Sequence, residues 1–137
     1  MSSGPGCTSF GPNDLVLLPK AVHEGTSADN HIFNQFTIRS AHRNALRAHL
    51  AELGIGSEIY YPVPFHRQEC FASLNCNDEA FPISNCLAAT VLALPIYPEL
   101  PEAHIHEVVN AIVAFEKSMA EHHSECPDCE ECGTTQA

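Results

Sequence analysis

One stretch near the middle of the chain decides the fold: Gly54-Ile55-Gly56-Ser57-Glu58-Ile59-Tyr60-Tyr61-Pro62-Val63-Pro64-Phe65-His66-Arg67-Gln68. Gly54 can adopt the positive φ that closes a helix. Residues 57–61 are rich in β-branched and aromatic side chains, so they are expected to be extended. Pro62 and Pro64 then fix φ twice in three residues and cannot continue a ladder of backbone hydrogen bonds. The stretch therefore predicts a helix end, a strand and then a rigid loop.

The rigid loop would hold five polar or aromatic side chains in set directions at a low cost in conformational entropy. They are Tyr60, Tyr61, His66, Arg67 and Gln68. Such groups on a stiff loop suit a ligand site or a contact between subunits. The alternative is a solvated turn whose aromatic side chains pack into the core, and the residue chemistry alone leaves both interpretations open.

The size and charge of the chain limit what it can bind. Its 137 residues suit one compact domain, and a hydrophobic content of 45% supplies a core. The formal net charge of −11 would repel nucleic acid and an anionic membrane surface. No apolar run is long enough to cross a bilayer, and residues 1–6 lack the basic and apolar regions of a signal peptide. A cytoplasmic protein is therefore expected.

Seven cysteines are present, and their spacing separates them into two groups. Four are scattered and, without an export signal, are expected to be reduced: Cys7, Cys70, Cys76 and Cys86. The other three follow one another at C-x-x-C-x-x-C spacing: Cys126, Cys129 and Cys132. Thiolates at this spacing can hold zinc or an iron–sulfur cluster, with His122 or His123 as a fourth ligand. A closed zinc site normally takes two such cysteine pairs that lie far apart in the sequence, and only one group is present here. A flexible acidic tail is therefore the alternative.

Apolar periodicity and turn residues predict alternating strands and helices along the rest of the chain. The expected elements are a strand or extended arm at 15–19, a strand at 31–39, a helix at 41–53 capped by Ser40, a helical turn and loop at 69–78, a helix at 84–91, a strand within 92–98 and a helix from 101 onward. The apolar stripe of the last helix is Ile105, Val108, Val109, Ile112, Phe115 and Met119. This order predicts an α+β domain: a small, mostly antiparallel sheet with helices packed on one face.

The same patterns divide the chain into three parts. Residues 1–14 are expected to be a disordered leader, residues 15–119 a single domain, and residues 120–137 a flexible acidic tail that contains cysteines. No complete catalytic motif is present. The only lysines, Lys20 and Lys117, are not expected to be buried, and an amine nucleophile generally needs desolvation or a nearby cation to lose its proton at neutral pH.

Several blocks, in order, resemble one enzyme family. They are Phe33-Asn34-Gln35-Phe36-Thr37-Ile38-Arg39, Arg43-Asn44-Ala45-Leu46, Leu50-Ala51-Glu52-Leu53-Gly54-Ile55-Gly56, Tyr60-Tyr61-Pro62-Val63-Pro64-Phe65-His66-Arg67-Gln68, Phe81-Pro82-Ile83-Ser84-Asn85 and Leu92-Ala93-Leu94-Pro95-Ile96-Tyr97-Pro98-Glu99-Leu100. From about residue 15 to residue 117 the chain resembles the C-terminal small domain of the DegT/DnrJ/StrS sugar aminotransferases, which depend on pyridoxal phosphate and have the aspartate-aminotransferase fold. The family usually has Asp where Asn44 stands and Glu where Asn85 stands.

The resemblance implies the chemistry of the full-length family. A lysine-bound pyridoxal phosphate accepts an amino group, usually from glutamate, and passes it to a keto sugar bound to a nucleotide. The small domain helps to close the active site, which makes Tyr61 and His66 the first candidates for substrate contacts. Tyr60, Arg67 and Gln68 follow them. The catalytic lysine belongs to a larger N-terminal domain without a match here, so the chain alone is expected to hold no tightly bound cofactor and to be inactive.

Three functions are compatible with these observations. The chain is a domain or fragment of a nucleotide-sugar aminotransferase, or it docks as a partner or regulator onto a separately encoded cofactor domain. In either case a large cofactor-binding domain or a homodimer partner of the family type is implied. The third possibility is a metal-binding adaptor that acts through its tail.

Overall fold

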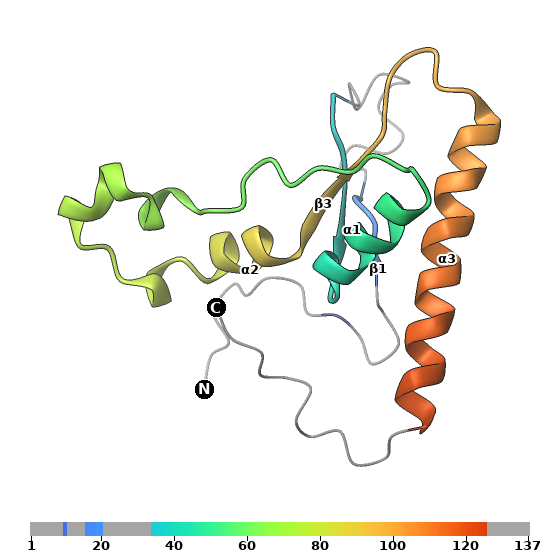
Figure 1. Ribbon diagram of the computed structural model, residues 1–137. Coiled ribbons are helices and arrows are strands. Elements are labelled where there is room, and N and C mark those ends of the chain that lie inside the picture. Colours follow the sequence, from blue (N-terminus) through green and yellow to red (C-terminus); the bar gives the residue numbers. More distant parts are fainter. Residues whose placement is uncertain (1–9, 11–15, 21–33, 126–137) are drawn as a thin grey trace.

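The computed structural model describes residues 10, 16–20 and 34–125, with side chains as far as residue 121 (Figure 1). The metal-ligand prediction for Cys126, Cys129 and Cys132 and nearly all of the predicted leader lie outside these residues. None of the helices in the described part combines the length and the apolar character that a membrane crossing requires.

Three strands form one antiparallel sheet in the order β1-β2-β3. They are β1 (Val16–Leu17), β2 (Phe36–Ser40) and β3 (Val91–Leu94). In the register of β2 with β3, Phe36 lies opposite Leu94 and Ile38 lies opposite Leu92. Because side chains alternate between the two faces of a strand, these four residues share one apolar face. The predicted small antiparallel sheet is confirmed.

Two helices pack on this face: α1 (Arg43–Glu52) and α3 (Glu102–Glu125). Figure 1 shows α1 in front of the strands and the long α3 alongside it. The buried core that joins them to the sheet consists of Ile38, Leu46, Leu50, Ile55, Leu92, Ala111 and Phe115. Within each helix the core residues are four positions apart, as one face of a helix requires. The predicted α+β class, with helices on one face of the sheet, is confirmed.

A third helix, α2 (Pro82–Thr90), leads directly into β3 and is tied to α1 by Arg43. Arg43 Nη1 donates to the carbonyl oxygens of Ala88 at 3.1 Å and Val91 at 3.2 Å. These carbonyls lie at the C-terminal end of α2, where a helix leaves acceptors unpaired and favours a positive charge. Arg43 Nε also donates to Asn44 Oδ1 at 2.7 Å. Asn44 therefore places a neutral amide beside the Arg43 guanidinium.

Two local predictions are wrong, one at residues 57–61 and one at Ser40. Residues 57–61 do not form a strand: only Glu58 pairs with Ala93 of β3, as a single bridge. Glu58 exchanges both backbone hydrogen bonds with Ala93, but no neighbouring residue continues the pairing, and Pro62 and Pro64 further along carry no N–H for a ladder. Ser40 does not cap α1, because it is fully buried at the end of β2 and its Oγ accepts from His42 N at 3.1 Å instead.

The predicted helix end at Gly54 is confirmed. Gly54 has a φ of +74°, and Ile55 N donates to Leu50 O at 2.9 Å. This is the pattern by which a left-handed residue closes a helix. The prediction of reduced cysteines holds for Cys70 and Cys76, which carry free thiols, and is wrong for Cys86, which is disulfide-bonded.

Candidate functional site

Residues 60–81 form an arm that projects away from the sheet and from α3 (Figure 1). Three short 3-10 turns shape it: η1 (Phe65–Arg67), η2 (Glu69–Leu74) and η3 (Asp78–Ala80). Pro64 precedes η1 with a φ of −58°, the value that its ring imposes, and its carbonyl oxygen accepts from Arg67 N at 2.9 Å. Asn75 ends η2 with a φ of +47°, a left-handed conformation that asparagine tolerates. The turn at Asn75 lets η3 return to η1.

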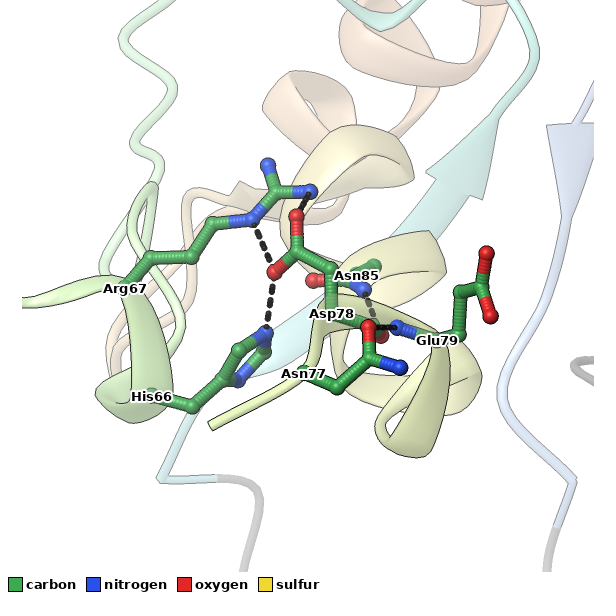
Figure 2. Close-up of polar contacts among 6 residues, drawn as sticks. All are labelled: His66, Arg67, Asn77, Asp78, Glu79 and Asn85. Atoms are coloured by element: carbon green, nitrogen blue, oxygen red, sulfur yellow. Dashed lines mark hydrogen bonds and ion pairs between the residues drawn. The ribbon is translucent and has the colours of Figure 1, made fainter. Parts of the chain in front are cut away.

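The carboxylate of Asp78, on η3, joins two side chains of η1 (Figure 2). It accepts from Arg67 at two points, with Nε 2.8 Å from Oδ1 and Nη2 2.5 Å from Oδ2. The same Oδ1 lies 2.8 Å from His66 Nε2. The side chains of Arg67 and Asp78 are about half exposed, whereas only 6% of the His66 side chain is exposed. One carboxylate therefore fixes a sheltered imidazole and a solvated guanidinium side by side.

The protonation of this cluster follows from its hydrogen bonds. The hydrogen bond from Arg67 is the main cause of the lowered pKa of Asp78, and the bond from His66 adds to it. The same contact raises the pKa of Arg67. Asp78 is therefore an ionised carboxylate at neutral pH and can only accept, so His66 Nε2 carries the proton. A neutral His66 ring then keeps a lone pair on Nδ1, which can accept a hydrogen bond from a ligand.

Three further residues support the cluster. The ring of Phe81 stacks on the His66 ring with centroids 4.6 Å apart. Asn85 Nδ2, from α2, donates to the backbone oxygen of Asp78 at 2.9 Å, and Asn77 Oδ1 accepts from the backbone nitrogen of Glu79 at 3.1 Å (Figure 2). The other amide atom, Asn85 Oδ1, is buried without a hydrogen-bond partner among the described residues. Asn85 thus anchors the arm to α2.

The structure brings together only some of the predicted site residues. His66 and Arg67 meet on Asp78, whereas Gln68 Nε2 turns back to the carbonyl oxygen of Val63 at 3.5 Å. Tyr60 and Tyr61 are exposed, at 53% and 70%. The alternative of aromatic side chains packed into the core is therefore wrong for these two tyrosines.

Sequence patterns missed Asp78, Phe81 and Asn77 as site residues. They lie in a segment whose asparagines and acids indicate only a turn. The contacts of Asp78 with η1 span 11 and 12 residues with only the short 3-10 helix η2 between them, so no helical or strand periodicity marks them. The proline-fixed loop was the one signal available, and it identified His66 and Arg67 but not Asp78.

A hollow of about 380 Å³ lies beside the cluster. It is lined by Phe65, His66, Phe71, Leu74, Cys76, Phe81 and Ser84. Phe65 and Phe71 meet edge to face with centroids 6.0 Å apart. The arm therefore presents aromatic walls with a few polar atoms at their margin, which is the usual make-up of a small-molecule site.

The described residues do not fit the reactive end of a pyridoxal phosphate site. That cofactor reacts through a lysine whose amine must lose its proton. Lys20 and Lys117 are both exposed, and neither lines the hollow of the arm. In the described part no group of three His, Cys, Asp or Glu residues could hold a metal ion either. The described residues therefore supply neither the buried lysine of such a cofactor site nor a metal centre.

Comparison with known proteins identifies the relatives of this chain. The model of the DegT/DnrJ/EryC1/StrS aminotransferase family matches residues 13–113. A pleiotropic regulatory protein of Geobacillus stearothermophilus is 40% identical over 107 residues, which make up 78% of this chain and 28% of that protein. The UDP-N-acetyl-3-dehydro-alpha-D-glucosamine 3-aminotransferase of Acidithiobacillus ferrooxidans is 39% identical over 101 residues, which make up 72% of this chain and 26% of that protein.

A solved structure shows the same fold. The crystal structure of a DegT DnrJ EryC1 StrS aminotransferase from Brucella abortus superposes with a TM-score of 0.62 at 32% identity. The superposition covers 76% of this chain and 27% of that one. The chain thus spans about a quarter of the length of the relatives that it matches.

Proposed function

The chain belongs to the DegT/DnrJ/EryC1/StrS aminotransferase family, and from this premise we propose that it forms the part of a nucleotide-sugar aminotransferase that contacts the substrate. The observation that carries this proposal is the arm, on which Asp78 fixes His66 and Arg67 in one cluster. The arm belongs to the region that the family model matches. Tyr61, with Tyr60 nearby, is proposed as a further substrate contact because both side chains are exposed.

Amino transfer in this proposal needs pyridoxal phosphate, which carries the amino group between donor and acceptor. The lysine that binds the cofactor is supplied by the part of the family's sequence that this span does not cover. That part lies either in the same polypeptide or in a separate cytoplasmic chain on which this domain docks. The role of the present residues is then to bind and orient the sugar nucleotide and to exclude water from it.

A second feature supports the need for a larger partner or a second subunit. An apolar groove of about 530 Å³ runs between α3 and the edge of the sheet. Its lining includes Val16, Leu18, Leu94, Ile105, Val109 and Val113. Leu18 is 68% exposed, and Ile105 and Val109 are nearly half exposed. An apolar surface of this kind is normally covered in the complete assembly.

A chimera tests the proposed function. Residues 13–113 would replace the matching quarter of the Acidithiobacillus ferrooxidans aminotransferase, and amino transfer to that enzyme's own substrate would be measured. We expect an active chimera, in which His66→Ala lowers kcat/KM by about tenfold or more through the loss of a positioned hydrogen bond. His104→Ala, which changes an exposed histidine of α3, is the matched control and should leave kcat/KM unchanged.

A second experiment uses the chain by itself and measures its absorbance with pyridoxal phosphate. Incubated with pyridoxal phosphate, it should not develop the stable visible absorbance of a lysine-bound cofactor, because both of its lysines are exposed. A chimera that folds and binds pyridoxal phosphate but transfers no amino group would refute the proposal. So would a chimera in which His66→Ala and His104→Ala behave alike.

A further inference from the structure

We propose that the hollow in the arm holds the nucleobase of the nucleotide-sugar substrate. The inference rests on the proposed function and adds to it the part of the substrate that the arm recognises. The ligand chemistry is a planar, uncharged heterocycle with hydrogen-bonding groups on its edge.

The walls of the hollow have the shape and chemistry for such a ring. Phe65 and Phe71 stand edge to face, and Phe81 backs the His66 ring, so three phenyl rings surround one space. The volume of about 380 Å³ falls within the range of small-ligand pockets. Nucleobases stack on aromatic side chains because every base presents a flat π-face.

Polar atoms stand at the margin of these walls. His66, Cys76 and Ser84 also line the hollow. Asp78 holds His66 Nε2, so Nδ1 is the ring nitrogen that can contact the ligand, and the Ser84 hydroxyl can both donate and accept. A base edge carries N–H donors and carbonyl acceptors, and these groups match it.

Charge favours the base over the diphosphate as the occupant. The guanidinium of Arg67, which is the one Arg or Lys among residues 60–81, is already matched by the two oxygens of Asp78. None of the described residues that line the hollow is a lysine or an arginine. The whole chain carries a formal net charge of −11, which repels a diphosphate. An uncharged ring enters such a site without this penalty.

The present exposure of the walls is explained by the same occupant. Phe65 is 70% exposed, Leu74 65%, Phe81 40% and Phe71 38%. Large apolar side chains gathered on a projecting arm lose favourable burial unless something covers them. A stacked base covers the ring faces and leaves the sugar and phosphates outside the hollow.

Two free thiols provide a direct test on the intact chain. Cys76 lines the hollow, whereas Cys70 is an equally free, exposed cysteine that does not. Peptide mass spectrometry would measure how fast iodoacetamide modifies each thiol at increasing concentrations of uridine. Uridine is the nucleoside of the UDP-sugar named for the Acidithiobacillus ferrooxidans relative. Ribose 5-phosphate, which has no base, is the control ligand. This test needs neither cofactor nor amino transfer, so its outcome is independent of the chimera experiment.

We expect uridine to slow modification of Cys76 by about tenfold at ten times its Kd, by mass action, and to leave Cys70 unchanged. Phe71→Ala should raise the Kd of uridine, read from this protection, roughly ten- to hundredfold, as the loss of a stacking ring does. Leu53→Ala, an exposed apolar position outside both the hollow and the apolar groove, should leave the protection intact. Circular dichroism would verify that both variants fold.

Each of four other results would overturn the inference. They are no protection of Cys76 at saturating uridine, equal protection of Cys70 and Cys76, equal protection by ribose 5-phosphate, and protection of Cys76 by raised protein concentration without any nucleoside. The last result would identify the hollow as a contact between copies of the chain. If the chimera transferred no amino group while uridine still protected Cys76, the proposed function would fail and the nucleobase site would stand.

Discussion

Replacing Gly54 by alanine tests the turn that leads from α1 toward the arm. Gly54 has a φ of +74°, and a Cβ at this position would meet no heavy atom within 4 Å. The cost is therefore backbone strain without a steric clash. For an L-residue in the left-handed region this strain is about 1–2 kcal/mol. The free energy of unfolding of Gly54→Ala should fall by about this amount, as measured by urea denaturation followed by circular dichroism.

The size of the loss can be checked in two further ways. For a domain of this size, each kcal/mol should lower the melting temperature by about 4–8 °C. Gly54→Asn should lose less stability than Gly54→Ala, because asparagine enters the left-handed region more readily.

Gly56→Ala is the matched control for this prediction. Gly56 lies two residues further along, has no positive φ, and a Cβ there would also meet nothing within 4 Å. The alanine should be neutral, or should stabilise the chain by up to about 1 kcal/mol through the unfolded state. Equal losses at the two glycines would refute the reasoning, since φ is the only relevant difference between them.

Three further predictions concern the arm, α2 and the tail. The pKa of Asp78 is lowered in the folded state, so its contacts stabilise the arm fully at a pH above the ordinary carboxyl pKa. This stabilisation should be lost as the pH falls through the folded-state pKa of Asp78. NMR signals of the arm should show this change, and Asp78→Asn should abolish it. Arg43→Met keeps the aliphatic stem but removes the donors to two carbonyls of α2 and should cost about 1–2 kcal/mol in urea, whereas Arg47→Met at an exposed ion pair should cost less than about 1 kcal/mol. A closed zinc site normally takes two separate cysteine pairs, and the tail offers only one group of cysteines. The purified chain should therefore contain no stoichiometric zinc or iron, and Cys129→Ser should not change the metal content measured by mass spectrometry.

The parts of the fold that could be predicted are those with a local cause. The apolar stripe of residues 105–119 predicts α3, because spacings of three and four place those side chains on one face of a helix. The end of β3 also has a local cause, since the strand ends directly before Pro95, whereas its first residue, Val91, was predicted to end the preceding helix. The end of α1 at Gly54 is local too, because few other residues tolerate its φ.

The parts that could not be predicted depend on partners far along the chain. A strand at residues 57–61 is reasonable on side-chain preference, yet the edge of β3 offers it only Ala93 as a partner. Preference for extended structure does not become a strand without a paired edge. Asp78 is a similar case: its role exists only because Asn75 reverses the chain and returns it to η1.

The arm has its own small aromatic cluster, but its position depends on the body of the domain. One end is fixed where Glu58 and Ala93 exchange backbone hydrogen bonds of 2.8 and 3.0 Å. The other end is fixed where Asn85 of α2 donates to the Asp78 carbonyl. Between these anchors the prolines at 62 and 64 remove much of the remaining freedom. The imidazole of His66 is therefore held relative to β3 and α2 although it lies outside the main core, and this is the requirement for a substrate contact on a projecting loop.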